Sequence, residues 1–325
     1  MKRVLVSSAV LAAALLAIVP ALRADVTTKE KTTFKMEGIM GGMINRAMGG
    51  SDGITSTVAV KGNRMARIGE KNGQIIDLSE EKVYTLDIGK KEYTVMTFAE
   101  FRQMMEEARK KAQEQAAQAS PQDKQAAQDA AKQLDFTVDV KETGQTKSVI
   151  GHTAREVVMT IAMHEKGKKI EESGGMILTN TLWIAPKIAA LDEMYDFQMR
   201  YIKALNLGAM IDPQQAGAIA AMIPGIGQMG EKLAAERRKL EGTTLSTTSV
   251  FETVKSPEDM KRAEAQNPAG GGGGIGGMLA GKLMKKGPVQ QRTKALTTTN
   301  DTLSIAPTAN AADLAIPAGF KEKKK

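Results

Sequence analysis

The chain has 325 residues, a formal net charge of +8, no cysteine and only 4% aromatic residues. This length allows one large domain or two small ones with a buried core. The absence of cysteine excludes disulfides and lipid attachment through a cysteine. The modest charge and the few aromatic residues disfavour nucleic-acid binding.

The N-terminus has the pattern of a secretory signal peptide. A basic start, Met1-Lys2-Arg3, precedes an apolar run over 4–19 and a small residue, Ala24, at a suitable cleavage point. We predict cleavage after Ala24, with Ala21 as the second choice. An uncleaved anchor is the alternative, but the apolar run is shorter than the ~20 residues of a membrane span. The expected location is periplasmic or secreted, and the protein is not expected to be a lipoprotein.

The mature chain is predicted to form one domain over 25–320, followed by a basic tail over 321–325 that we expect to be solvated and frayed. A strand is expected over 25–36, and a loop rich in Gly and Met over 38–53. Short alternating segments then predict an antiparallel meander. Asn72-Gly73 is a strong turn signal within it. The predicted strands of the meander are 54–60, 64–68, 74–78, 83–88 and 92–96.

The hydrophobic period changes at Thr97, which predicts a helical insertion over 97–134. Thr97 and Glu100 have the spacing of a capping box. Phe98 and Phe101 lie on one face at helical spacing. Beyond Ala108 the sequence is rich in Ala, Gln, Glu and Lys, which predicts an arm with little apolar surface to bury.

Strands return after the arm, over 136–140, 154–164 and 176–184, with a turn expected at Gly144-Gln145. A helical segment is predicted over 187–240, a strand over 243–254 and a short helix from Pro257. A Gly-rich linker over 267–287 precedes a last strand over 293–305 and an extended segment over 314–320. The apolar stripe of the helix after 187 is Ile188, Leu191, Tyr195, Met199 and Ile202. The pattern predicts an α+β fold with an antiparallel sheet, one face of which is covered by the Phe98 and Tyr195 helices.

No motif in the chain specifies catalysis. The run from Gly225 to Gly230 matches G-x-G-x-x-G, but an Ala-rich helical stretch precedes it instead of a strand, so we interpret it as a turn that ends a helix. The two histidines, His152 and His164, would both be needed for a metal site. We therefore predict a protein that is not an enzyme and has no metal and no cofactor, although a hydrolytic pair of carboxylates stays open as a third hypothesis.

The run from Gly73 to Met96 resembles a family of uncharacterised exported bacterial proteins. The shared pattern is Ile-Asp-Leu, then Lys-x-Tyr-x-Leu-Asp, then Lys-x-Tyr, and similar stretches occur at 150–158, 182–184 and 316–320. That family is similar to the LolA/LolB-type lipoprotein carriers. The resemblance implies a half-barrel, which is a curved antiparallel sheet covered by helices that holds acyl chains in an apolar hollow. It implies no catalytic residues.

The first functional hypothesis is an envelope protein that binds a lipid or acyl chain between sheet and helices. The second is a structural component of the envelope with a protein partner and no small ligand. Peripheral membrane contact is possible in both, and nucleic acid is not an expected partner. The predicted ligand-lining residues are Tyr84, Leu86, Tyr93, Met96, Phe98, Phe101, Met159, Ile161, Met163, Trp183 and Tyr195. Residues predicted to form a mobile apolar lip are Met40, Met43, Met48, Met278 and Met284.

Overall fold

A computed structural model describes residues 25–37, 52–118, 133–205, 224–265 and 290–324, together with Ser120, Gln122, Gln125 and Asp129. The predicted signal peptide, the Gly/Met-rich loop over 38–53 except for its last two residues, and the Gly-rich linker over 267–287 lie outside the described residues. So do all five methionines of the predicted lip.

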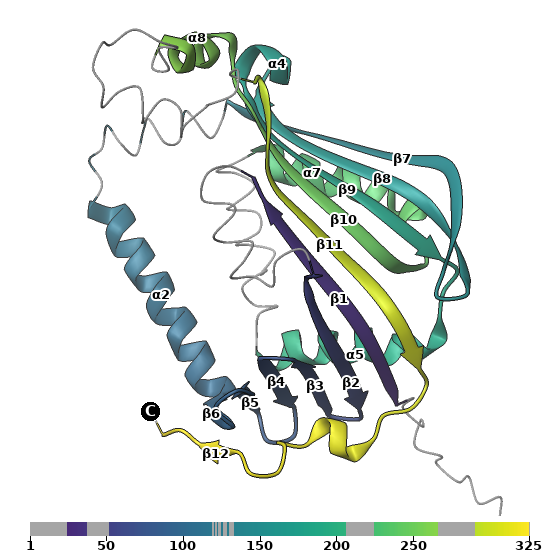
Figure 1. Cartoon of the computed structure of the whole chain (residues 1–325). Helices are drawn as coiled ribbons and strands as arrows, with labels where there is room; N and C mark the ends of the chain where they lie inside the picture. Colours follow the sequence, from purple (N-terminus) through teal and green to yellow (C-terminus); the bar gives the residue numbers. More distant parts are fainter. Residues whose placement is uncertain are drawn as a thin grey trace, which may run out of the picture.

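The described residues form an α+β fold, as predicted, with one sheet of twelve strands (Figure 1). The strand order is β12-β6-β5-β4-β3-β2-β1-β11-β10-β9-β8-β7, and the sheet is not closed, because β12 and β7 stand at opposite ends of it. Neighbours are antiparallel except β12 and β6. The strands are β1 (Val26–Met36), β2 (Ile54–Lys61), β3 (Arg64–Gly69), β4 (Asn72–Asp77), β5 (Lys82–Asp87), β6 (Glu92–Thr97), β7 (Leu134–Val149), β8 (His152–Glu165), β9 (Gly175–Ala185), β10 (Thr243–Val254), β11 (Arg292–Ala306) and β12 (Lys321–Glu322).

Five α-helices accompany the sheet in the described part of the chain: α2 (Phe98–Gln118), α4 (Ile170–Ser173), α5 (Asp192–Ala204), α7 (Pro224–Ala235) and α8 (Pro257–Ala265). Short 3-10 turns are η2 (Ala189–Leu191), η4 (Arg237–Leu240) and η5 (Ala311–Leu314). The predicted capping box at the start of α2 is confirmed. The Thr97 amide donates to the Glu100 carboxylate at 2.7 Å, and the Glu100 amide donates to Thr97 Oγ1 at 3.1 Å.

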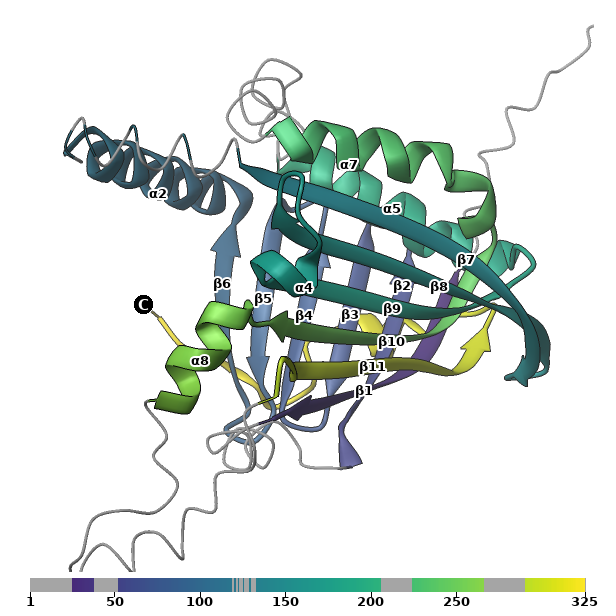
Figure 2. The same ribbon diagram turned by 90° about the horizontal axis from the view of Figure 1, so that it is seen from above.

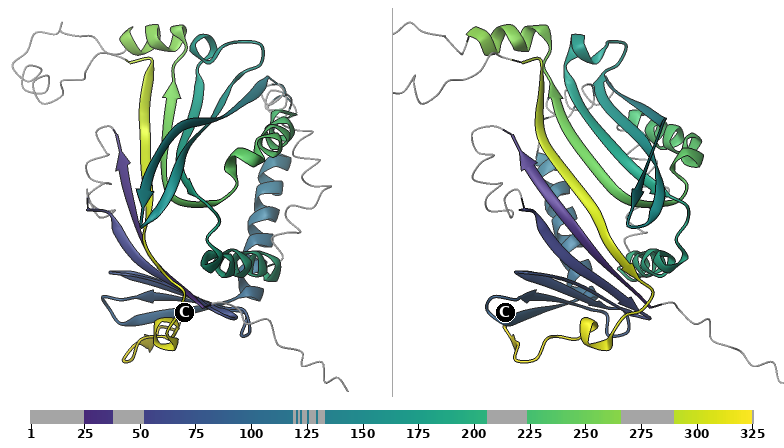
Figure 3. Two further views of the ribbon diagram at one scale, coloured as in Figure 1. Left: turned by 90° about the vertical axis from the view of Figure 1, so that its right-hand side faces the viewer. Right: turned by 45° about the vertical axis from the view of Figure 1, so that its right-hand side comes forward.

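The strand β1 joins two meanders that follow one another along the chain, β2–β6 and β7–β11. It pairs with β2 on one side and with β11, which lies near the other end of the chain, on the other side. Seen from above, β2–β6 run across the direction of β7–β11, so the sheet is strongly bent (Figure 2). Helices α2, α5 and α7 lie on one side of this bend, and the C-terminal segment lies on the other side of β2–β6 (Figure 3). We call the side of α5 and α7 the inner face and the opposite side the outer face.

The main core lies between α5 and the inner face of β1–β6. Phe197 of α5 and Phe98 of α2 are fully buried there, against Val58, Val60 and Met65 of the sheet. Arg200 fixes the helix to the β2–β3 turn, because it donates to the Gly62 carbonyl at 2.9 Å and to Asn63 Oδ1 at 2.7 Å. An ion pair with the buried Glu193 of the same helix, at 2.8 Å, orients its guanidinium. A helix over this range was predicted correctly.

The predicted packing face of this helix is correct for Leu191, which packs against the main core, but wrong for Tyr195 and Met199. Tyr195 and Met199 of the predicted stripe are 66% and 47% exposed, whereas Phe197 is fully buried. The residues that contact the core, Met194, Phe197 and Tyr201, follow the same helical period on a neighbouring face. Apolar residues lie on both faces of α5, so the period alone did not distinguish them.

A second core lies on the outer face of β2–β6, under the C-terminal segment. Leu314 is buried there against Ala59, Ile75 and Tyr84, with Phe320 beside them. The chain then adds β12 to the edge of β6: the amides of Lys321 and Lys323 donate to the carbonyls of Lys91 and Tyr93 at 2.9 and 2.8 Å. The prediction of a frayed tail from 321 was therefore wrong for 321–323, because backbone pairing holds these residues.

Two predicted turns lie elsewhere in the structure. The turn before β4 is at Glu70-Lys71, and Gly73 is buried inside β4, where a Cβ atom would approach Ile68 Cδ1 to 2.8 Å. Gly144, at φ +78°, occupies a bulge within β7, and the chain reverses at Ile150-Gly151 instead. The Gly225–Gly230 run lies within α7, so the prediction that it ends a helix was also wrong. Gly73 meets a local packing requirement and Gly144 a bulge, and a turn signal in the sequence does not distinguish either from a turn.

Candidate functional site

The register of the strands assigns their side chains to the two faces. On the inner face, one row of apolar side chains crosses six neighbouring strands, β1, β11, β10, β9, β8 and β7, and every member is half-buried. The row consists of Met36, Leu296, Phe251, Leu178, Ile161 and Val138. Leu296, Phe251, Leu178 and Ile161 belong to none of the buried clusters formed by the described residues. We call this set the inner apolar row.

Further apolar side chains extend this row along the strands. Met163 and Met176 pair across β8 and β9, Phe136 pairs with Met163 on β7, and Phe34 lies two residues before Met36 on β1. Met176 is 37% exposed. Apolar surface thus continues beyond the six-residue row on the inner face.

The outer face of the same strands carries a row of threonines, together with small apolar clusters such as that of Ala162, Ile177 and Val254. Thr33, Thr299, Thr248 and Thr181 follow one another in register across β1, β11, β10 and β9, and Thr248 hydrogen-bonds Thr299 at 3.4 Å between their Oγ1 atoms. These threonines are half-buried, a position that suits threonine because its branched side chain packs well on a pleated sheet. On this half of the sheet, the inner apolar row thus lies on the side of α5 and α7, and a row of threonines lies opposite it. Polar side chains also lie on the inner face beside the row, where Ser249 Oγ donates to Asn180 Oδ1 at 2.6 Å.

The edge strand β7 is covered by α7 and the turn that follows it. Lys232 Nζ of α7 donates to the Phe136 carbonyl at 2.9 Å, and Lys239 Nζ of η4 donates to the Val140 carbonyl at 2.9 Å. These lysines satisfy main-chain acceptors of the edge and keep α7 beside the inner apolar row. Leu240 packs against the buried Val140, Val157 and Ile184 in the same region.

A charged pair lies on the inner face of β1–β3, on the α5 side of the inner apolar row. Arg67 Nη1 donates to Glu30 Oε2 at 2.7 Å and to Ser56 Oγ at 3.3 Å. Glu30 also accepts a hydrogen bond from Thr28 Oγ1 at 3.2 Å. The Glu30 side chain is only 14% exposed, whereas that of Arg67 is 46% exposed. The carboxylate thus holds a guanidinium that stays accessible to solvent.

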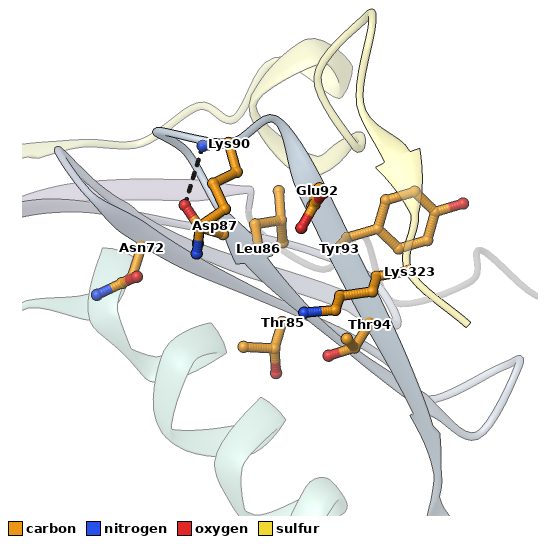
Figure 4. Close-up of a pocket in the computed structure, with 9 residues that line it drawn as sticks. All are labelled: Asn72, Thr85, Leu86, Asp87, Lys90, Glu92, Tyr93, Thr94 and Lys323. Atoms are coloured by element: carbon orange, nitrogen blue, oxygen red, sulfur yellow. Dashed lines mark hydrogen bonds and ion pairs between the residues drawn. The ribbon is translucent and has the colours of Figure 1, made fainter. Parts of the chain in front are cut away.

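A shallow pocket of about 270 Å³ lies at the β4–β6 end of the sheet (Figure 4). Asn72, Thr85 and Thr94 lie on the helix side of the strands, and the Lys323 side chain reaches the same pocket from the end of the chain. Lys90 pairs with Asp87 at 2.8 Å, and hydrogen bonds from Lys90 lower the pKa of Asp87. The lining combines polar and charged side chains with apolar surface from residues such as Leu86 and Tyr93.

The predicted ligand-lining residues do not share one surface. Met159, Ile161 and Met163 lie on the inner face of β8, beside or within the inner apolar row. Tyr84, Leu86 and Tyr93 lie on the outer face beneath the C-terminal segment. Met96 faces the inner side in register with Val83, while Phe98 and Phe101 pack in the main core. One hollow therefore cannot be lined by all eleven residues.

Trp183 and Tyr195 lie away from the other predicted residues. Trp183 is on the outer face, where Lys147 Nζ lies 4.1 Å from the centre of its ring. Tyr195 is largely exposed on α5. An aromatic side chain by itself carries no information about which face of a strand or helix it occupies.

The Tyr84 side chain has a structural environment in the outer core. Burial, and after it the hydrogen bond that its hydroxyl donates to Glu80, raises the pKa of Tyr84 to about 12. The same hydrogen bond lowers the pKa of Glu80. A tyrosine held neutral in this way supports packing under the C-terminal segment.

The described residues contain no group of three or more His, Asp or Glu side chains placed to hold a metal ion. His152 is exposed at the β7–β8 turn, and His164 Nδ1 lies 3.0 Å from the Glu165 carbonyl. No helix of the described part is both long and apolar enough to cross a membrane.

No protein-family model matches the chain, and no curated protein matches it either. Among solved structures, the chain superposes on one described as "Structure of PNGF-II in C2 space group" with a TM-score of 0.27 and 8% sequence identity. The superposition covers 93% of this chain and 31% of the other chain. The chain thus spans less than a third of that structure, and a likeness of this size carries no argument about fold or function.

Proposed function

We propose that this protein is an exported, non-enzymatic binding protein of the cell envelope that holds a lipid or acyl chain against the inner face of its sheet. In this proposal, the bent, open sheet with helices on its inner side serves as a half-barrel of the LolA/LolB type. The protein would act in the periplasm or outside the cell, after removal of the N-terminal 24 residues.

The observation that carries the proposal is the inner apolar row. Six half-buried side chains from six strands form one apolar surface inside the bend, while the opposite face of the same strands carries threonines. Burying apolar area contributes roughly 25 cal/mol per Å², so an acyl chain that contacts this row would gain affinity without specific polar contacts. Sites for small ligands are generally lined by apolar side chains with a few polar groups among them.

The test introduces a charge on either side of one strand. Phe251→Asp places a carboxylate in the inner apolar row, and Val250→Asp, the matched control, places it on the outer face one residue away. We expect the purified wild-type protein to bind a fluorescent fatty acid and to contain bound lipid that mass spectrometry detects. Phe251→Asp should abolish binding, and Val250→Asp should leave it unchanged.

Circular dichroism would verify that both variants are folded. Wild-type protein that contains no lipid and takes up no fatty acid would contradict the proposal. Equal loss of binding in the two variants would show that the inner apolar row is not the site.

A protein partner is the second candidate function, and exposed apolar residues of α5 favour it. Tyr195 and Met199 lie one turn apart and are 66% and 47% exposed. A photo-crosslinking residue at Met199 should then capture an envelope protein, whereas one at Gln198 on the same helix should not. This hypothesis also predicts that deletion of residues 112–133 abolishes the cross-linked product. That result would assign the predicted helical arm to the same interface.

A further inference from the structure

We propose that Arg67 recognises an oxyanion, such as a carboxylate, at the polar end of an acyl ligand whose chain lies along β1 toward the inner apolar row. This inference rests on the proposed function and adds to it the chemical class and the orientation of the ligand. It derives from the position of one accessible guanidinium on the same face as the apolar surface.

Arg67 is arranged to bind an anion in addition to its partner in the protein. A guanidinium has five N–H donors, and both contacts of Arg67 with neighbouring side chains involve Nη1 alone. Nearly half of its side chain is exposed. Glu30 is largely buried and is engaged by both Thr28 and Arg67, so it orients the guanidinium while its own carboxylate is already satisfied. Arginine binds carboxylates and phosphates well because its planar donors match two oxygens at once.

The strand β1 connects this cation to the apolar surface. Thr28, Glu30 and Thr32 lie on the inner face and are followed at the same spacing of two residues by Phe34 and Met36. At a rise of ~3.3 Å per residue, Glu30 and Met36 are about 20 Å apart along the strand. One leaflet of a bilayer has a hydrocarbon thickness of about 15 Å, half of the ~30 Å core. The distance from Arg67 to the far end of β1 therefore accommodates one acyl chain with its polar group at Arg67.

Charge argues for an anion at the polar end instead of a cation. A ligand cation near Arg67 would be repelled by it, and Glu30 is nearly enclosed by its existing partners. An uncharged polar group would gain only ordinary hydrogen bonds. An oxyanion gains charge-assisted hydrogen bonds, which are roughly twice as strong as neutral ones.

The experiment compares palmitate with its uncharged methyl ester, both below their micelle concentrations, as competitors of an uncharged fluorescent naphthylamine probe. Arg67→Gln should weaken palmitate binding about 10- to 100-fold, the loss expected for a hydrogen-bonded charge. Binding of the ester should not change. Glu30→Gln should instead tighten palmitate binding several-fold, because it removes the anion that competes for the guanidinium. Lys31→Gln, on the outer face of β1, is the matched control and should have no effect.

The two variants distinguish recognition from a structural role of the pair. If the pair only stabilised the fold, both substitutions would break it and both would weaken binding of palmitate and ester alike, which would overturn the inference. Competition by acetate at the concentration effective for palmitate would also overturn it, because the site would then be a contact for any anion. Equal binding of palmitate and its methyl ester by the wild type would refute this inference but would leave the proposed function standing. A wild-type protein that binds none of the probes would refute the proposed function and the inference with it.

Discussion

Replacing Phe197 tests directly which face of α5 holds the protein together. Phe197 is fully buried in the main core, and the Arg200 guanidinium lies 5.4 Å from the centre of its ring. A buried phenylalanine removes roughly 200 Å² from water, worth about 5 kcal/mol as an upper bound at ~25 cal/mol per Å². Measured Phe→Ala substitutions in cores cost about 3–5 kcal/mol. We therefore expect Phe197→Ala to lower the free energy of unfolding by about 4 kcal/mol.

Tyr195→Ala is the matched control on the same helix. Its side chain is 66% exposed, and substitutions at such surface sites usually change stability by less than about 0.5 kcal/mol. The assay is urea unfolding followed by far-ultraviolet circular dichroism. The slope of the free energy of unfolding against urea concentration should be equal in the two variants. A loss at Tyr195 as large as that at Phe197 would refute the assignment of the packing face. It would favour instead the stripe predicted from the sequence.

Two further predictions concern backbone conformation and pH. Gly175 has φ +151°, and a Cβ atom there would lie 2.1 Å from a main-chain oxygen of β8. Gly175→Ala should therefore lower the free energy of unfolding by about 2 kcal/mol or more, measured by thermal unfolding. Gly167→Ala, with φ +80° but nothing within 4 Å, should cost clearly less, and equal losses would contradict the steric argument. Because the pKa of Tyr84 is raised from 10.0 to about 12, the folded state holds this proton more tightly than the unfolded state. Its contribution is complete below pH 10 and is lost between pH 10 and 12. The free energy of unfolding should fall less steeply over this range in Tyr84→Phe, and an unchanged slope would show that Tyr84 is not responsible.

The sequence by itself determined most of the secondary structure. Alternation of apolar and polar residues located the strands of both meanders, because successive side chains of a strand point to opposite faces. The Thr97–Glu100 spacing located the start of α2, because the hydrogen bonds of a capping box form within four consecutive residues. These features depend on neighbours in the chain, so they were predictable without the fold.

Only the tertiary structure decided which face is inner and which residues share it. Tyr84 and Val83 alternate on β5, yet Tyr84 packs under the C-terminal segment and Val83 packs under α5. Alternation says that the two residues point apart, but not what covers each of them. The inner apolar row takes one residue from each of six strands, and the pairing of β1 with β11 brings together residues more than 250 positions apart. The same holds for Arg67 and Glu30, which meet because β1, β2 and β3 are neighbours. Long-range pairing and the placement of covering segments thus determined the candidate site, and no local pattern encodes either.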